Sequence, residues 1–468
     1  MNKDSSIALL AQRLRAEARL LPAGERLPSS RTLTERYRVS PVTVSRALAL
    51  LAAEGVVVTR PGSGTFVAER RAAGRPADFG WQSVVLGEGQ GGVEGMARLL
   101  TPPPADAIAL SGGYLPLAFQ PLRALAAASA RAARRPEAWQ VPPLAGLPEL
   151  RAWFAAPVGA EPSDVLVAGG GQAALWTTLR ALLRPGEPLL MESPTYHGAI
   201  IAARAAGLHP VPVPMDGRGV RPDLLAEAFA RTGARAFYCQ PAFHNPTGAV
   251  LAPERRARVL EAARTAGAFV IEDDFARYLA FSTPPPPLAA ADPDGTVVHL
   301  ASLTKPTAPS LRIAGITARG PVAERLRACQ LVESYYPARP LQETALELVT
   351  SPAWPRHLRA VSAELRARRD ALVRALAVHL PEVELVSLPE GGMHLWVRLP
   401  DGTDDTALAD AARAHGVIVG PGRPYFPAEP PAPHLRLNYN CTPTAEDLAE
   451  GVRRLARALR SRPSGTSS

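Results

Sequence analysis

The chain has 468 residues, 47% of them hydrophobic and 20% charged, which is enough for about two to four domains with real cores and excludes a disordered protein. Three cysteines, an odd number without CxxC spacing, argue against a disulfide framework and against a cysteine zinc site, so no metal is expected. Because no leader-like segment opens the chain and no apolar run approaches about 18 residues, we expect a cytoplasmic protein with no membrane partner.

The basic residues are concentrated near the N-terminus. The formal net charge is +9, and residues 1–75 carry most of it, with 13 lysines and arginines against 6 acidic residues. This concentration predicts a nucleic acid or another polyanion as partner, although a solvated basic face is the plainer alternative.

The first 70 residues have the pattern of three helices followed by two short strands. Apolar residues recur at three- and four-residue steps from Ile7 to Leu21, which predicts a first helix. A short second helix follows a serine cap at position 29 or 30, and Ser40 caps a third helix whose first residue, Pro41, needs no amide donor. Two β runs, 56–59 and 65–67, then form a wing, so residues 1–70 are predicted to be a winged helix-turn-helix.

The stretch from Leu27 through Glu54-Gly55 to Val67 resembles the winged helix of GntR-type transcription regulators. The resemblance implies a double-stranded DNA operator as partner, with the third helix in the major groove, Arg31 on phosphate and the wing tip near the minor groove. Pro41 and Ser45 stand where this family often carries base-reading arginines, so base readout is assigned to Thr43, Ser45 and Arg46. A winged helix used for protein contacts is the alternative. The candidate DNA-binding residues are Arg31, Ser40, Thr43, Ser45, Arg46, Arg60, Gly62 and Ser63.

Residues 71–105 are rich in Gly, Ala, Arg and Pro and are predicted to be a linker with one short structured piece around Trp81 to Leu86. From residue 106 to about 320, apolar strands alternate with helices. This alternation predicts an α/β domain with a mostly parallel sheet, whose strand-end loops form a site.

Several of these strands end in loops with a distinct chemistry. Strand 165–168 runs into three glycines, Gln172 and a helix from Ala173 to Leu183, and a helix N-terminus after a glycine turn offers unpaired N–H groups to an anion. Tyr196 follows strand 188–191, and Asn245 lies in the Asn-Pro-x-Gly loop after strand 236–240. Strand 269–274 ends in the acids Glu272, Asp273 and Asp274. Each feature also has an ordinary alternative. The glycines and the Asn-Pro-x-Gly loop could be plain turns, Tyr196 could be a packing aromatic, and Glu272 or Asp274 could be a helix cap.

Lys305 stands out because the chain has 52 lysines and arginines, of which only Lys3 and Lys305 are lysines. A primary amine can condense with an aldehyde to a Schiff base, which an arginine cannot do. Lys305 follows the buried strand 297–300, with Ser302 just before it and Arg312 seven positions after it. A hydroxyl, an amine and a guanidinium on one strand-end loop suit an anionic aldehyde, and pyridoxal 5'-phosphate (PLP) is the obvious one. A stray surface lysine is the alternative.

These elements, in this order, resemble the site of the fold-type I PLP enzymes, the aspartate aminotransferase-like superfamily. The resemblance implies that Gly171 and Gln172 donate main-chain N–H groups to the phosphate, that Tyr196 stacks on the pyridine ring, and that Asn245 binds the ring hydroxyl. Asp273 is matched to the carboxylate that keeps the ring nitrogen protonated. The implied cofactor-binding residues are Gly171, Gln172, Tyr196, Asn245, Asp273, Ser302, Lys305 and Arg312, with Lys305 also catalytic.

The C-terminal part, 321–460, resembles the small domain of the same superfamily, which would make the large domain residues 106–320. In it, Arg436 matches the arginine that receives an amino acid's α-carboxylate, and a core-edge arginine is the alternative. The polar tail 461–468 is predicted to be disordered.

A GntR winged helix joined by a linker to an aminotransferase-like domain is similar to the MocR subfamily of bacterial transcription regulators. The resemblance implies a head-to-tail homodimer that binds DNA, carries PLP as a Lys305 aldimine, and senses PLP itself or a small amine or amino-acid effector. The alternative is an active PLP-dependent aminotransferase with an accessory DNA-binding domain, in which Lys305 moves a proton.

Two departures weigh against turnover. Val141 stands where aminotransferases usually carry a tyrosine that reaches the partner's phosphate. In Asp273-Asp274-Phe275-Ala276, the tyrosine hydroxyl expected near the ring oxygen is absent, unless Tyr278 supplies it. Neither loss prevents PLP binding, and both suit sensing better than catalysis.

Overall fold

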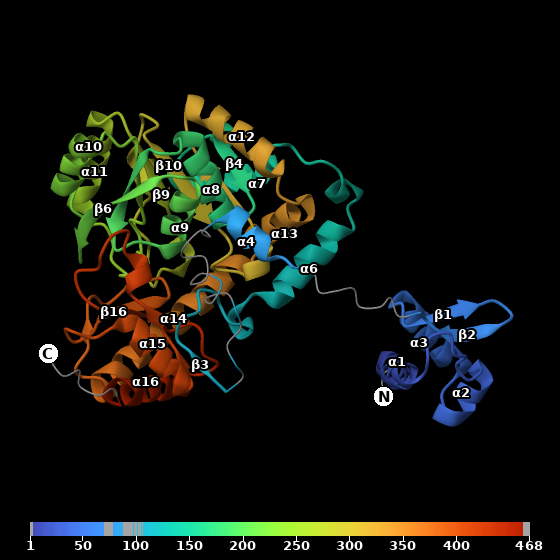
Figure 1. Ribbon diagram of the computed structural model, residues 1–468. Coiled ribbons are helices and arrows are strands. Elements are labelled where there is room, and N and C mark those ends of the chain that lie inside the picture. The colour runs from blue at the N-terminus through green and yellow to red at the C-terminus, as the bar shows by residue number, and fades with distance from the viewer. Residues whose placement is uncertain are drawn as a thin grey trace. The chain divides into compact units, whose positions relative to one another are not determined.

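The computed structural model describes residues 3–69, 78–87, 97, 101, 104 and 106–461, and the chain divides into two compact units, Met1–Gly89 and Gln90–Ser468 (Figure 1). Apart from 78–87 and single positions, the predicted linker 71–105 lies outside the described residues, as does the predicted disordered tail 461–468 beyond Ser461. The helix α4 (Gly80–Leu86) stands where a short structured piece was predicted.

The first unit has the predicted winged-helix architecture. Its elements are α1 (Lys3–Leu20), α2 (Ser30–Tyr37), α3 (Pro41–Ala53), β1 (Val57–Arg60) and β2 (Gly64–Val67). Leu14, Leu33 and Leu51, one from each helix, are completely buried in a single core. The apolar stripes recognised in the sequence therefore face one another, because residues three and four apart lie on one side of a helix.

Two serines begin the second and third helices. The Ser29 side chain accepts a hydrogen bond from the Thr32 amide, and the Ser40 side chain accepts one from the Thr43 amide, both at 3.1 Å. Pro41 occupies the first turn of α3, as predicted. The antiparallel strands β1 and β2 pair from Val57 with Val67 to Arg60 with Gly64, and the tip between them forms the wing.

Within the described residues, the second unit is built on an eight-stranded sheet of order β4-β11-β10-β9-β8-β5-β6-β7. The strands are β4 (Val165–Ala168), β5 (Pro188–Ser193), β6 (His209–Asp216), β7 (Gly219–Val220), β8 (Ala236–Cys239), β9 (Phe269–Asp273), β10 (Val297–Ser302) and β11 (Ala314–Thr317). The strands β6, β5, β8, β9 and β10 pair in parallel, and β11 is antiparallel to both β10 and β4. The predicted mostly parallel sheet is thus confirmed, and β4, β5, β8, β9 and β10 all end at the same edge.

Helices cover both faces of this sheet. They are α7 (Pro148–Ala155), α8 (Gly171–Leu182), α9 (His197–Ala205), α10 (Pro222–Thr232), α11 (Pro253–Thr265) and α12 (Pro321–Ser334). The helix α13 (Arg339–Val349) shares a core with α7 and β4, and α6 (Leu122–Ala133) packs against α13. Along β9, Ile271 packs in the core with α8 and α9, whereas Val270 packs in the core with α10 and α11. Because successive strand residues point to opposite faces, a sheet covered on both sides requires the continuous apolar runs found in the sequence.

A second, smaller sheet lies in the C-terminal part. Its order is β12-β13-β16-β15, and it is flanked by helices that pack around a separate core. The elements are α14 (Ala353–His379), β12 (Glu384–Leu385), β13 (His394–Arg398), α15 (Asp405–Ala414), β14 (Val417–Ile418), β15 (Gly420–Pro421), β16 (His434–Asn438) and α16 (Ala445–Arg460).

A short upstream strand, β3 (Ile108–Ala109), pairs in parallel with β14, and Leu110 is buried in the same C-terminal core. The sequence pattern assigned this segment to the large domain 106–320. In the structure, β3 and β14 form a separate two-stranded sheet and Leu110 packs in the C-terminal core, so the chain passes through the C-terminal part before it enters the large sheet.

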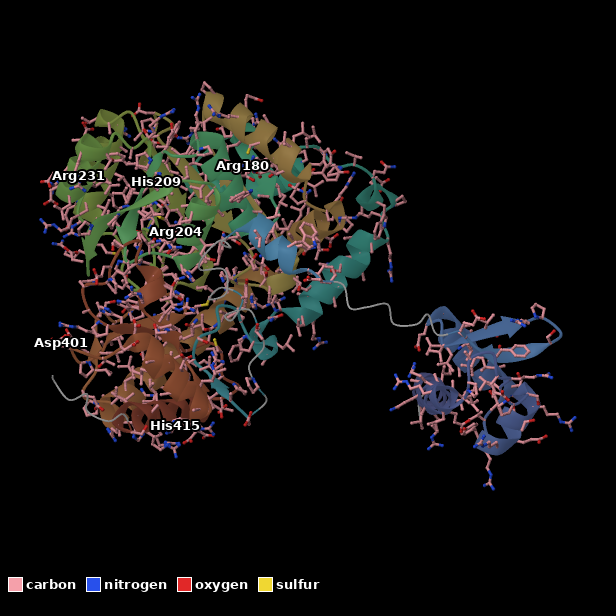
Figure 2. All side chains as sticks on the ribbon, in the orientation of Figure 1. Arg180, Arg204, His209, Arg231, Asp401 and His415 are labelled. Carbon is pink, nitrogen blue, oxygen red and sulfur yellow. The ribbon has the colours of Figure 1, made fainter. Side chains whose placement is uncertain are left out.

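Polar side chains such as those of Arg231, Asp401 and His415 lie exposed at the periphery of the second unit (Figure 2). No helix in the described ranges is long and apolar enough to cross a membrane.

Candidate functional site

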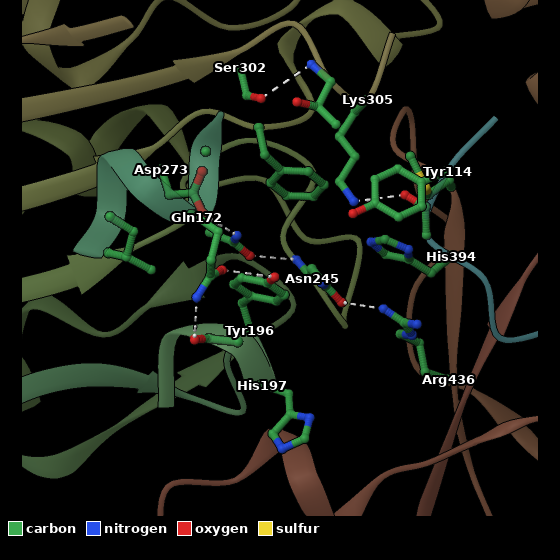
Figure 3. A pocket seen from close by; sticks show the side chains of 18 of the residues that line it. Tyr114, Gln172, Tyr196, His197, Asn245, Asp273, Ser302, Lys305, His394 and Arg436 are labelled. Atoms are coloured by element: carbon green, nitrogen blue, oxygen red, sulfur yellow. Dashed lines mark hydrogen bonds between the residues drawn. The ribbon is translucent and has the colours of Figure 1, made fainter. Parts of the chain in front are cut away.

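The strand ends of the large sheet surround one pocket (Figure 3). Strands β4, β5, β8, β9 and β10 end at its edge, and β13 and β16 of the small sheet close the opposite side. The structure brings all nine residues predicted for cofactor and effector binding into this pocket. They are Gly171, Gln172, Tyr196, Asn245, Asp273, Ser302, Lys305, Arg312 and Arg436.

Lys305 is held in the pocket by groups that the sequence did not suggest. Its Nζ donates a hydrogen bond to the Gly113 carbonyl at 2.7 Å and lies 4.1 Å from the centre of the Tyr114 ring. Burial, and then the nearby Arg436, lower the pKa of Lys305 to about 8. A lysine with a lowered pKa has a larger neutral fraction near neutrality, and only the neutral amine is a nucleophile.

Asp273 lies at the end of β9 and is fixed by two donors from β8 and the residue after it. The Tyr238 hydroxyl donates to Asp273 Oδ2 at 2.6 Å, and Gln240 Nε2 donates to the same oxygen at 2.8 Å. Burial raises the pKa of Asp273, and the hydrogen bonds from Tyr238 and Gln240 oppose this shift. A cationic ring nitrogen beside Asp273 would favour its ionised form further.

The N-terminus of α8 makes a corner suited to an anion. Gly170 precedes the helix with a φ of +95°, and a Cβ at this position would lie 2.7 Å from Cζ of Arg312. Ser302 comes from the end of β10, next to Gly171. Within the described residues Arg312 has no carboxylate partner, so its charge stays available to a ligand phosphate beside the free N–H groups of the helix.

Tyr196 and Gln172 form a hydrogen-bonded side of the pocket, and Asn245 is bonded separately. The Tyr196 hydroxyl donates to Gln172 Oε1 at 3.3 Å, and Gln172 Nε2 donates to the Gly198 carbonyl at 3.2 Å. Burial raises the pKa of Tyr196, which keeps its hydroxyl protonated. The Asn245 side-chain oxygen accepts a hydrogen bond from Arg436 at 3.3 Å, which links the loop of Asn245 to the small sheet.

Tyr278 does not supply the tyrosine hydroxyl that was expected near the ring oxygen of the cofactor. Its ring stacks on that of Trp153, with the ring centres 5.5 Å apart, and lies edge-on to Trp354, with the ring centres 5.6 Å apart. Tyr278 does not line the pocket. The suggestion that Tyr278 replaces the expected tyrosine is therefore wrong, because this ring is taken up by an aromatic cluster of the core. Phe275, which has no hydroxyl, lines the pocket instead.

Several pocket residues were missed by the sequence interpretation. Gln240 follows β8 directly, and the strand-end rule that identified Asp273 could have found it. His394 lies in a glycine-rich motif that was noticed but given no role. Tyr114 had no usable signal, because it comes from a segment nearly two hundred residues upstream of Lys305.

The residues predicted to bind DNA lie on two exposed features of the first unit. On α3, Ser45 and Arg46 are exposed and Thr43 is half-buried, and at the wing tip Arg60, Gly62 and Ser63 are exposed. The Ser40 hydroxyl is already engaged as the cap of α3 and lies 2.9 Å from the Thr43 hydroxyl.

Arg31 on α2 is 91% exposed at its side chain and pairs with Glu35 at 3.3 Å. Arg60 lies over the Phe66 ring at 5.0 Å. An exposed ion pair contributes little, so Arg31 can exchange Glu35 for a phosphate at small cost.

Comparison with known proteins places each unit in a family. The model of "Aminotransferase class I and II" matches residues 105–455, and that of "Bacterial regulatory proteins, gntR family" matches residues 8–67. An uncharacterized HTH-type transcriptional regulator of Bacillus subtilis, YdfD, is 28% identical over 92% of this chain and 91% of its own length. The probable rhizopine catabolism regulatory protein MocR of Rhizobium meliloti is 28% identical over 94% of this chain and 91% of its own length.

Among solved structures, LysN of Thermus thermophilus is similar to the second unit. This α-aminoadipate aminotransferase, complexed with N-(5'-phosphopyridoxyl)-L-leucine, is 31% identical, covers 81% of this chain and 98% of its own, and has a TM-score of 0.74. The relatives thus include both transcription regulators and a transaminase.

Proposed function

The chain belongs to the aminotransferase class I and II family and carries a GntR-family domain ahead of it, the MocR-type arrangement, and from this premise we propose that it is a PLP-dependent transcription regulator. The observation that carries the proposal is a buried amine pocket around Lys305 in the same chain as an exposed helix-turn-helix. A protein that acts on DNA in a bacterium works in the cytoplasm.

The residues of the pocket fit PLP. Gly170 has no Cβ, and a Cβ at this position would collide with the Arg312 side chain. Arg312 has no partner among the described residues, so a phosphate group would fit between this guanidinium and the helix N-terminus. Asp273 is buried and already held by two donors, which leaves its other oxygen for the ring nitrogen. When bound, PLP supplies an aldehyde that a primary amine attacks and a protonated ring that withdraws electrons.

The pocket side chains would then have separate roles in binding PLP and an effector. Lys305 would be the amine that holds PLP covalently, Asn245 would hydrogen-bond its ring oxygen, and Tyr196 would cover the ring. Arg436 receives the carboxylate of an effector. Phe275 lines the pocket without a hydroxyl, so the site would lack one contact that a catalyst would use to hold the ring oxygen as an anion.

We propose that a small amine or amino acid, or PLP itself, changes the affinity for DNA through this pocket in a head-to-tail homodimer. Thr43, Ser45 and Arg46 would read bases, and Arg31 and the wing tip would contact the backbone. By linkage, an effector shifts DNA affinity only as far as it distinguishes two arrangements of the dimer, typically about 1–3 kcal/mol.

An active aminotransferase is the second candidate, and it is favoured by the 31% identity to a transaminase that covers 81% of this chain. The deciding experiment is a DNA-binding titration with and without PLP and amines, beside a keto-acid-coupled transamination assay with the same amines. A change in DNA affinity without appreciable turnover supports the regulator. Turnover of several molecules per second, with DNA affinity unaffected by PLP or amines, would establish the enzyme instead.

A further inference from the structure

His394 is a buried polar side chain that has no partner in the described structure. It is 2% exposed, it lines the pocket, and neither ring nitrogen has a hydrogen-bond partner among the described residues. Its ring stacks on Phe275, with the ring centres 6.2 Å apart and the planes 17° apart. Leaving both ring nitrogens unsatisfied is costly, and buried polar groups without partners are rare in folded proteins. A ligand in the pocket is the natural source of the missing hydrogen bond.

The register of the small sheet places His394 beside Arg436. In the antiparallel pair of β13 and β16, His394 lies opposite Asn438, and Trp396 lies opposite Arg436. His394 and Arg436 are therefore diagonal neighbours on the same face, at a spacing of about 7–8 Å that long and aromatic side chains bridge. Figure 3 shows His394 between Arg436 and the end of Lys305.

Arg436 is also incompletely satisfied. Its two terminal nitrogens donate to Asn245 Oδ1 at 3.3 Å and to the Ser111 carbonyl at 2.8 Å, whereas its buried Nε has no partner among the described residues. No carboxylate in the described part of the chain pairs with Arg436. A buried cation that lacks an anion is unfavourable, so the ligand that completes this corner carries a negative charge.

The surroundings of His394 indicate the protonation state of its ring. Burial, and then Arg436 and Lys305, lower the pKa of His394 well below its usual range, so the ring is neutral in the free pocket. A neutral imidazole has one N–H donor and one acceptor nitrogen. Beside Arg436, the N–H is the group that complements an anion.

We infer that His394 and Arg436 together bind the carboxylate of an amino-acid effector, with Arg436 supplying the charge and His394 a hydrogen bond to the carboxylate. This inference rests on the proposed function and adds His394 as a further residue that selects effectors with a carboxylate over amines that lack one. The two oxygens of a carboxylate can accept from two donors, which matches the unpartnered nitrogens on this face of the small sheet.

The test uses the PLP-loaded full chain and follows the change in its visible absorbance on titration. The probes are L-leucine, L-phenylalanine and L-lysine, each beside the amine that lacks its carboxylate: 3-methylbutylamine, 2-phenylethylamine and 1,5-diaminopentane. His394→Phe keeps the stacking on Phe275 and removes both nitrogens, and His394→Gln keeps a side-chain N–H donor. Borohydride trapping of PLP confirms that each variant folds and is loaded.

We expect His394→Phe to weaken the binding of responsive amino acids about tenfold to hundredfold, as for a hydrogen bond to a charged group, and to leave the matched amines unchanged. His394→Gln should restore part of the preference. Equal weakening of amino acids and amines, or no effect, overturns the inference but leaves the proposed function standing. If no amino compound changes the absorbance or the DNA affinity of the wild-type protein, effector sensing itself is refuted.

Discussion

The side-chain amide of Gln240 donates a hydrogen bond to Asp273 Oδ2 at 2.8 Å, while its oxygen accepts the Asn245 backbone N–H at 3.0 Å. The orientation of the amide follows from its partners, because only N–H can face a carboxylate and only oxygen can face an N–H. One side chain thus joins the residue assigned to the ring nitrogen with the loop assigned to the ring oxygen.

Replacing Gln240 by leucine is expected to weaken PLP binding by about tenfold or more, because a hydrogen bond to a charged group is lost and the Asn245 amide is left unsatisfied. Gln240→Glu should weaken it further, since two carboxylates would then face each other. PLP titration of the apoprotein measures both effects. Gln330→Leu is the matched control, because Gln330 is also buried and hydrogen-bonded but does not line the pocket. Unchanged affinity in both Gln240 variants would contradict the bridging role.

Lys305→Ala is expected to abolish covalent attachment of PLP, since no other lysine lines the pocket in the described structure. The wild-type protein should be yellow, with a visible absorbance band that borohydride bleaches, and the variant should lack this band. Lys305→Arg keeps the positive charge and should lack it too. A wild-type protein that stays colourless after incubation with PLP would refute the assignment of the pocket.

The rate of PLP attachment to the apoprotein is expected to rise with pH through about 8. Burial and Arg436 lower the pKa of Lys305 to about 8, so the reactive neutral amine predominates above that pH and the protonated amine below it. Stopped-flow absorbance across a pH series locates the midpoint. A midpoint at the ordinary lysine pKa would show that Lys305 is not desolvated in solution.

DNA binding should weaken steeply as the salt concentration rises, because phosphate contacts release counterions. Arg31→Ala is expected to weaken binding to all sequences alike and to reduce the salt slope by about 1, whereas Arg46→Ala should cost about 1–3 kcal/mol and relax the preference at one base pair. Arg231→Ala, on the exposed end of α10, is the control. If removal of residues 1–70 left DNA binding intact, the regulator proposal would fail.

Ser40 separates folding from recognition. Ser40→Ala removes the α3 cap and should lower the stability of the winged helix by about 1 kcal/mol. Ser40→Asp keeps a capping side chain and should restore most of this stability, but its negative charge should weaken DNA binding if α3 approaches phosphate. Thermal unfolding and DNA titration of both variants distinguish the two roles. Full DNA affinity in the aspartate variant would place Ser40 away from the DNA.

Local features were predictable from the sequence because their causes are local. The cap of α3 joins Ser40 to the amide of Thr43, three residues away, and the continuous apolar strands of the sequence predict that both faces of the sheet are buried. Nine residues that line the pocket were also predicted, since Gly171, Asp273 and Lys305 lie at or just after strand ends, and parallel strands present their carboxyl ends at one edge.

The tertiary structure decided the contacts between segments that lie far apart in the chain. The strand pattern tells which residues are buried but not which strand lies beside which. Only the pairing of β13 with β16 places His394 beside Arg436, and only the course of the upstream segment brings Tyr114 to Lys305. Tyr278 shows the same limit, because a tyrosine in the segment that follows the end of β9 can enter either the pocket or the core. Packing against Trp153 and Trp354 put it in the core, and no local pattern contains that information.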